Sequence, residues 1–177
     1  FIPLIISMSQ PAYAQAVSDE FLPTRTEEVC LDGGMMLRIL DYPGREAVAV
    51  STIIGGGKLE EPARKEGLTH LTEHLWFTAP RAELPTVWER LDALGAEFNA
   101  STHLGHTAFT TIGAHTDLDL LLDIEAERFS DWTAPLQEDD VAREVQVLHQ
   151  ETRESERNIL RQATDRLSRN LYPADHP

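Results

Sequence analysis

The pattern of apolar and polar positions divides the chain into segments with strand-like and helix-like periodicity. Residues 46–54 are rich in β-branched side chains, which predicts a buried strand that runs into three consecutive glycines. Residues 29–40 hold two apolar runs on either side of an Asp-Gly-Gly sequence, which is typical of a β-hairpin. Residues 98–102 and 106–112 predict two further strands joined through a glycine.

Helical periodicity predicts helices over residues 68–78, 86–94, 117–132 and 138–170. The second of these has Pro85 in its first turn and Gly95 at its end, and the third begins with Asp117 as its N-cap. The fourth is long and strongly charged. Because helices of mixed length alternate with strands at hairpin spacings, the expected fold class is α+β rather than a doubly wound sheet.

Composition narrows the class of protein. The chain has 177 residues, a formal net charge of -15 and an isoelectric point near 4.7. Its length suits one domain with a real hydrophobic core. The acidic balance argues against binding to nucleic acid or anionic lipid, because either partner requires a basic face. Cys30 is the single cysteine, which excludes an internal disulfide and a cysteine-based zinc finger.

The first residues have the features of an export signal. The apolar run at residues 1–8 is too short to span a bilayer, and Ala12-Tyr13-Ala14 has the small-x-small form of a signal-peptidase site. We therefore expect residues 1–16 to be a signal-peptide remnant, residues 17–28 a polar lead-in, and the protein to be exported, to a bacterial periplasm or the medium. The alternative is an apolar terminus that frays or packs on the domain as a strand.

One stretch indicates metal chemistry. His70 and His74 are four residues apart on a predicted helix, so both imidazoles project from one face and can share one metal ion. Glu73 flanks the same face, where a carboxylate can reach a metal-bound water. Zinc suits such ligands and keeps one position open for water in catalytic sites. Taken alone the pattern also fits an ordinary surface helix, and a third ligand is needed.

The same residues carry a resemblance. His70-Leu-Thr-Glu73-His74 is the inverted zinc motif H-x-x-E-H, and together with the glycines at 55–57 and the acidic loop ending at Pro62 it resembles the pitrilysin/insulinase family of metallopeptidases. The family's spacing implies Glu151, 77 residues after His74, as the third zinc ligand, with one zinc ion per chain. It also implies that Glu144 orients a ligand histidine by accepting a hydrogen bond from its other ring N–H, and that Glu73 is the general base.

The resemblance implies a fold and a substrate-binding strand as well. The expected domain covers residues 29–177, a mixed, largely antiparallel sheet covered by helices, and is truncated at its C-terminal end. Asn99-Ala100-Ser101-Thr102 resembles the family's N-A-x-T edge strand, so Asn99 and Ala100 are expected to pair with substrate backbone. For Asn99, an ordinary residue at the end of a strand is the alternative.

The function expected from the resemblance is a zinc-dependent endopeptidase that hydrolyses short or unfolded peptides. Its expected partners are the peptide substrate and a second domain or subunit that completes a clamshell, with no nucleic acid and no membrane span. One alternative is a non-catalytic subunit of the same fold that binds peptide or a partner, and another is a metal-storage domain. His103 and His106 are expected to be surface residues rather than ligands, and His149 is expected to point away from Glu151 on its helix and not to be a ligand.

Overall fold

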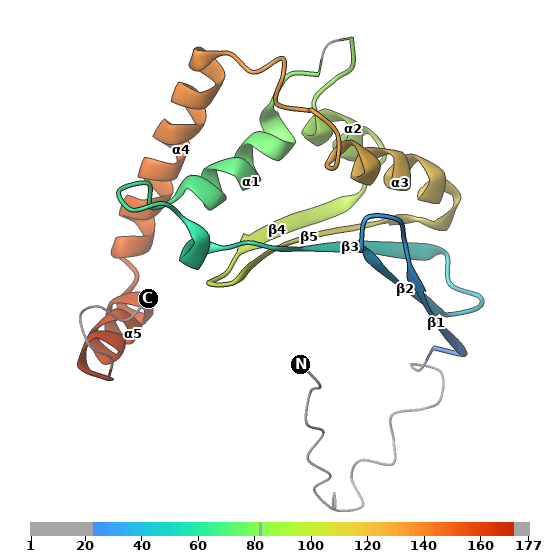
Figure 1. Ribbon diagram of the computed structural model, residues 1–177, viewed down its shortest axis with the longest axis horizontal. Helices are drawn as coiled ribbons and strands as arrows, with labels where there is room; N and C mark the ends of the chain where they lie inside the picture. Colours follow the sequence, from blue (N-terminus) through green and yellow to red (C-terminus); the bar gives the residue numbers. More distant parts are fainter. Residues whose placement is uncertain (1–22, 82, 172–177) are drawn as a thin grey trace, which may run out of the picture. The chain divides into compact units, whose positions relative to one another are not determined.

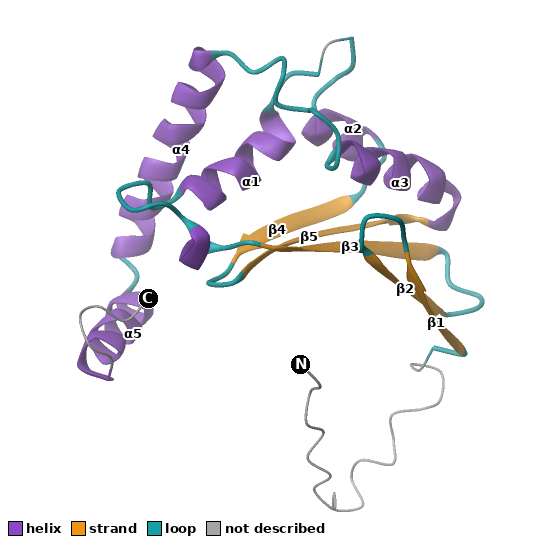
Figure 2. Ribbon diagram, viewed as in Figure 1, coloured by secondary structure: helices purple, strands orange, loops and turns teal. Residues whose placement is uncertain are grey.

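The computed structural model describes residues 23–81 and 83–171 (Figure 1). Its strands are β1 (Arg25–Cys30), β2 (Met36–Asp41), β3 (Ala47–Gly55), β4 (Glu97–Thr102) and β5 (His106–Ala114). Its helices are α1 (Leu68–Thr78), α2 (Val87–Ala93), α3 (Leu118–Glu127), α4 (Glu138–Glu156) and α5 (Ile159–Leu171), with 3₁₀ turns η3 (Lys58–Glu60) and η4 (His115–Asp117). The predicted α+β class with antiparallel sheets is confirmed (Figure 2). The predicted signal-peptide remnant lies outside the described residues.

The chain forms two compact units, and the first of them, which ends at Arg45, contains the hairpin β1–β2. The two strands are antiparallel, and Cys30 pairs with Met36 next to the turn. Gly33 and Gly34 turn the chain with φ angles of 90° and 88°, a region that side chains disfavour. The predicted hairpin is confirmed.

The first strand of this hairpin begins earlier than its polar sequence indicates. Residues 25–28 were expected to belong to the lead-in, but they form the first part of β1. Both strands are largely exposed, so polar side chains carry no burial cost here. Across the pair, the Arg38 guanidinium donates to the Glu28 carboxylate from Nε at 2.9 Å. Such cross-strand charge pairs stabilise a two-stranded sheet whose two faces are both exposed to solvent.

The second unit begins at Glu46 and contains an antiparallel sheet in the order β3-β5-β4. Helices α1, α2 and α3 lie on one face of this sheet, and α4 packs beside α1 (Figures 1 and 2). Strand β3 shows why one face is covered: its side chains alternate between half-buried and exposed positions along its length. The half-buried set points toward the helices and the other set, which includes Ile53, points away.

The core of this unit lies between the helices and the covered face of the sheet. It is a cluster of buried apolar side chains: Trp76, Phe77, Val87, Leu91, Phe109, Leu121 and Ile124. Four of the elements contribute, so the cluster fixes α1, α2 and α3 against β5. Burial of this aromatic and aliphatic area is the main stabilising contribution to the unit.

A charged pair is buried beside this core. Arg128 donates two hydrogen bonds to the Glu125 carboxylate, from Nε at 3.0 Å and Nη2 at 2.7 Å, and Thr52 donates a third at 2.7 Å. The guanidinium also stacks over the rings of Phe109 and Trp76. Burial lowers the pKa of Arg128 from its usual value, while Glu125 opposes that shift. Removing either partner would leave an uncompensated buried charge.

Each of the four predicted helical segments is helical in the structure, but not every boundary is as predicted. Helix α1 has the predicted bounds. Pro85 precedes the N-cap Thr86 of α2 rather than lying in its first turn. Asp117 is the N-cap residue of α3 as predicted, although its side chain makes no capping hydrogen bond. Helix α3 ends at Glu127 instead of residue 132.

The predicted long helix is two helices. Helix α4 ends at Glu156, and Arg157 and Asn158 donate backbone hydrogen bonds to Glu154 and Ser155 in a tightened last turn. The carbonyl of Asn158 then accepts from the backbone N–H of Gln162, which starts α5. Asparagine is a residue type favoured at the N-terminal boundary of a helix. In the described part of the chain, no helix is both long and apolar enough to cross a membrane.

Candidate metal centre

Helix α1 brings the two histidines together. Gly67 precedes the helix with φ of 91°, a conformation that glycine adopts without strain. Four residues along a helix advance the chain by slightly more than one turn, so His70 and His74 lie on one face. Their rings meet edge to face, and their Nε2 atoms are 3.2 Å apart. Two nitrogen lone pairs are thereby brought to one point.

Helix α4 adds a carboxylate at the same point. The Oε2 atom of Glu151 lies 3.7 Å from Nε2 of His70 and 3.5 Å from Nε2 of His74. Among the described residues, these three form the single group of histidine, cysteine and acidic side chains whose geometry would suit one metal ion. Ligands 2.0–2.1 Å from a tetrahedral zinc ion are about 3.4 Å from one another. The donor set and its spacing therefore fit zinc.

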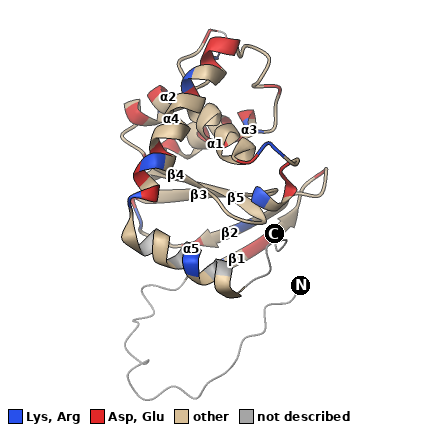
Figure 3. Ribbon diagram, turned by 90° about the vertical axis from the view of Figure 1, so that its left-hand side faces the viewer, with Lys and Arg blue, Asp and Glu red and all other residues tan. Residues whose placement is uncertain are grey.

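Glu144 lies behind His74. Its Oε2 atom is 3.4 Å from Nδ1 of His74, the ring nitrogen that faces away from the donor cluster. Glu144 is 5% exposed and is the one buried residue of α4, a helix rich in charged residues (Figure 3). Acidic side chains are rarely buried without a partner. A carboxylate at this position directs a proton to Nδ1 and leaves Nε2 free to bind a metal.

The electrostatics of the cluster favour a neutral imidazole. Burial lowers the pKa of His70 below its ordinary value, and the charges of Glu73 and Glu151 offset that effect only in part. A neutral ring keeps the lone pair on Nε2 that a metal ligand requires.

Glu73 is held from a different direction. It is 8% exposed, and its Oε2 atom accepts a hydrogen bond of 2.5 Å from Oγ1 of Thr102 at the end of β4. Thr102 ends the N-A-x-T stretch predicted to form the substrate-binding strand, but its bond to Glu73 was not predicted from the sequence. A strand's side chains alternate between its two faces, so Thr102 shares a face with Ala100 and Phe98, and that alternation could have placed it under α1.

A hollow of about 400 Å³ opens beside the donor atoms. Its lining includes the cluster itself, a wall of aromatic side chains and a few neighbouring residues. The lining residues are His70, Glu73, His74, Phe77, Thr78, Trp88, Phe98, Asn99, Ala100 and Glu151. The structure therefore places Asn99 and Ala100, the predicted substrate-strand residues, next to the cluster. His103 and His106 stack on each other at the β4–β5 turn, and His149 is absent from the donor group.

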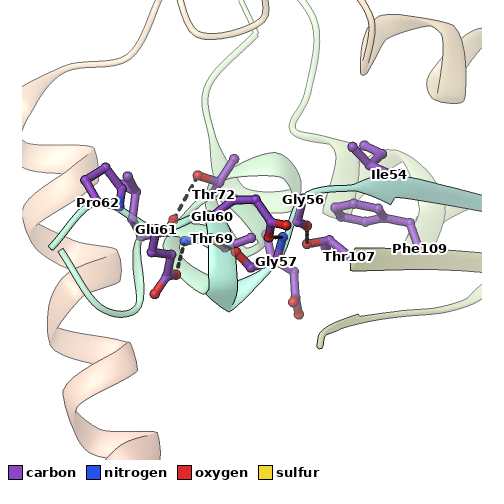
Figure 4. Close-up of a pocket in the computed structure, with 12 residues that line it drawn as sticks. Ile54, Gly56, Gly57, Glu60, Glu61, Pro62, Thr69, Thr72, Thr107 and Phe109 are labelled. Carbon is purple, nitrogen blue, oxygen red and sulfur yellow. Dashed lines mark hydrogen bonds between the residues drawn. The ribbon is translucent and has the colours of Figure 1, made fainter. Parts of the chain in front are cut away.

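The two ends of α1 are held by residues outside the helix. At its start, the Glu61 carboxylate accepts hydrogen bonds from the backbone N–H groups of Thr69 at 2.7 Å and Gly67 at 2.9 Å (Figure 4). At its end, the buried Arg81 donates to the carbonyls of Trp76 at 2.9 Å and Ala79 at 3.1 Å. A negative group at the start and a positive group at the end both complement the helix dipole. These contacts fix α1 without a capping side chain of its own.

Known proteins are similar to this chain over most of its length. The family model described as Insulinase (Peptidase family M16) matches residues 39–176. An uncharacterized zinc protease of Mycobacterium leprae is 32% identical over 108 residues, which are 58% of this chain and 24% of that protein. Another, from Mycobacterium bovis, is 31% identical over 122 residues, which are 68% of this chain and 26% of that protein.

Two further similarities point the same way. The coenzyme PQQ synthesis protein F of Klebsiella pneumoniae is 29% identical over 143 residues, which are 75% of this chain and 17% of that protein. The crystal structure of a protease from Helicobacter pylori superposes with a TM-score of 0.64 and 25% identity, covering 76% of this chain and 32% of that chain. This chain thus spans about a quarter of the length of the mycobacterial relatives.

Proposed function

This chain belongs to the insulinase family, peptidase family M16, and on that premise we propose that it carries the zinc site of a metalloendopeptidase. His70, His74 and Glu151 would hold one zinc ion per chain, and the substrates would be short or unfolded peptides. The support for the ligand assignment is the convergence of three donor atoms at distances of 3.2–3.7 Å. The relatives named as zinc proteases support the choice of metal.

The proposed chemistry is the hydrolysis of a peptide bond. Bound zinc lowers the pKa of a water ligand and polarises a carbonyl oxygen. Glu73 would take a proton from the attacking water on its carboxylate and pass it to the leaving amine. Glu144 would hold the proton on Nδ1 of His74, so that this ligand keeps one tautomer. Each step proposed for this chain thus uses a side chain that lies at or beside the cluster.

The substrate would lie along β4 as an added strand. β4 pairs with β5 on one side only in the described part of the chain, so the opposite edge offers free backbone groups. Asn99 and Ala100 lie on this edge strand and line the hollow beside the donor atoms. A peptide in this position would have a carbonyl group close to the cluster.

One observation favours catalysis over a non-catalytic, peptide-binding or partner-binding subunit. Glu73 lines the same hollow as the three donors and is buried there. A metal site that only binds or stores gains nothing from a buried base beside it. The same proposal includes a second domain or subunit that completes a clamshell, and export of the protein from the cytoplasm.

The test combines metal analysis with peptide cleavage, on the complete gene product. We expect about one zinc ion per chain, and cleavage of an unstructured fluorogenic peptide that stops on chelation and returns with zinc. Glu73→Gln should retain zinc and lower kcat by about 10²- to 10⁴-fold, because the amide cannot accept the proton. Glu154→Gln, an exposed change on α4, should leave both unchanged. Equal cleavage by Glu73→Gln and the unaltered protein would refute the proposed mechanism.

A further inference from the structure

Thr102 of β4 has a side chain that donates a hydrogen bond to the proposed base. It is the last residue of β4 and pairs with Thr107 of β5. By the two-residue period of a strand it shares a face with Phe98 and Ala100, both of which pack against the core cluster that includes α1. Its hydroxyl therefore faces α1, whereas Ser101, on the opposite face, lies within hydrogen-bonding distance of His103.

The contact between Thr102 and Glu73 is short and is not duplicated. Oγ1 of Thr102 donates to Oε2 of Glu73 at 2.5 Å, and no other hydrogen bond to this carboxylate exists among the residues that the structure describes. A glutamate side chain has three rotatable bonds, and this contact is the hydrogen bond that restrains its end in the described structure. Threonine is a suitable donor because its branched side chain is stiff about χ1 and holds the hydroxyl in place.

We propose that Thr102 is a positioning residue for the general base, an inference that rests on the proposed peptidase function. By binding Oε2, it leaves Oε1 as the oxygen free to receive a proton. A charge-assisted hydrogen bond of this kind is stronger than a neutral one, so it selects one orientation of the carboxylate. A displacement of the base by about 1 Å costs about 100-fold in rate, so restraint of the carboxylate in one orientation favours catalysis.

The position of Thr102 also links two tasks to one strand. Asn99 and Ala100, the proposed substrate-binding residues, lie three and two positions before it on β4. The strand that sets the register of the peptide would therefore also set the orientation of the base. Any shift of β4 would move both together, which keeps the scissile carbonyl and Glu73 in register.

Thr107 provides a matched control for this inference. It lies opposite Thr102 in the sheet, it is 5% exposed, and its hydroxyl donates to the backbone carbonyl of Gly56 at 3.1 Å (Figure 4). Thr107→Val therefore removes a hydroxyl and a hydrogen bond from the same part of the sheet without touching Glu73. A loss of stability alone would affect both variants.

The kinetic experiment compares Thr102→Val, Thr102→Ser and Thr107→Val in the complete gene product. Thr102→Val should lower kcat by about 10- to 100-fold with KM and zinc content within about twofold, because binding is retained and the base is misplaced. Thr102→Ser keeps the hydroxyl and should restore kcat to within about threefold of the unaltered protein. Thr107→Val should keep kcat within about twofold, whatever its melting temperature.

A structural readout decides the same question without activity. In crystal structures of the metal-free proteins, Glu73 should have one conformation in the unaltered protein and in Thr102→Ser, and a changed or split conformation in Thr102→Val. An unchanged Glu73 in Thr102→Val, or kcat within twofold in that variant, would overturn the inference. If the unaltered protein showed no zinc-dependent cleavage, the proposed function would fall, and the metal-free structures would still decide whether Thr102 holds Glu73.

Discussion

At the scale of single residues, the side chain of Glu151 has fewer contacts outside the metal cluster than the side chains of the other members have. Its side chain is 47% exposed, and its carboxylate contacts only His70 and His74 among the described residues. His74 is supported by Glu144 as well as by its own helix. A change at residue 151 should therefore act on metal affinity with little effect on the fold.

Glu151→Gln should weaken zinc binding by at least about 100-fold, because it removes one of three protein ligands and the negative charge that offsets the cation. The melting temperature of the metal-free protein should stay within about 2 °C. Competition with a zinc-binding dye would give the dissociation constant. Glu154→Gln, one turn further along α4, is the matched change and should bind zinc like the unaltered protein. Equal zinc affinity in the two variants would remove Glu151 from the ligand set.

The residues of the site differ in how far the sequence could reveal them. His70, Glu73 and His74 lie within five positions of one helix, so their proximity follows from helical spacing alone. Glu151 and Glu144 come from a distant helix, and only the family resemblance pointed to them. Thr102 was missed because its role depends on the packing of β4 beneath α1. The alternation of β4 can place Thr102 on the face toward α1, but it does not identify Glu73, 29 residues away in the sequence, as the hydrogen-bond partner.

At the scale of elements, α1 is held from outside at both ends. Its N-cap residue is Gly67, which has no side chain to accept a hydrogen bond, and its last turn has no basic residue. Glu61 and Arg81 supply these interactions from the flanking loops. Although its partial burial acts to raise it, the pKa of Glu61 is lowered overall by the backbone N–H groups of Thr69 and Gly67 and by the Lys58 charge.

Glu61→Gln should lower the free energy of unfolding of the metal-free protein by about 0.5–1 kcal/mol at pH 7, at the low end because solvent screens this carboxylate. Since the folded pKa is lower than the ordinary value of 4.5, the contribution is complete above that pH and is lost as pH falls through the folded pKa. Urea unfolding at pH 7 and at pH 3.5 would measure the difference.

The control for this change is Glu66→Gln, in the same loop. Glu66 is exposed and accepts no hydrogen bond in the described structure, so its replacement should alter stability by less than about 0.5 kcal/mol at either pH. A Glu61→Gln effect of the same size at pH 3.5 as at pH 7 would show that the charge of Glu61 is not its cause.

Element boundaries were less predictable than the elements themselves. The apolar period that defines α3 continues in the sequence, but Arg128 turns inward to pair with Glu125 and the backbone leaves the helix there. The break between α4 and α5 has no glycine or proline to mark it. At this break the backbone of Asn158 forms hydrogen bonds to Ser155 and Gln162. The pattern of charged residues in the sequence does not reveal such a turn.

At the scale of the whole molecule, the sheet of the second unit has a free edge. β3 pairs with β5 alone in the described residues, and its nine residues contain no charge and no proline. Ile53, on the face away from the core, is 71% exposed. Natural edge strands of this length usually carry lysine, proline or a bulge that discourages pairing with another chain. β3 carries none of these, so it is suited to accept a further strand.

Ile53→Lys should reduce self-association of the 177-residue chain, raising its apparent dissociation constant by about tenfold. A charge on an exposed edge strand opposes strand addition, and the outward position spares the core. Sedimentation velocity over a range of concentrations would measure the effect. Leu104→Lys also replaces an exposed aliphatic side chain, 58% exposed, but lies in the β4–β5 turn. An equal effect of the two changes would attribute association to general hydrophobicity rather than to the edge of β3.

The separation of the donors along the chain has a thermodynamic consequence. Two of them lie one turn apart on α1, while the third follows 77 residues later on α4. An ion held by all three would act as a cross-link that closes this loop. A cross-link across such a loop lowers the entropy of the unfolded chain and so raises its free energy by roughly 4 kcal/mol. Release of the ion would then make separation of α4 from α1 easier, and slow amide exchange in α4 would depend on metal occupancy.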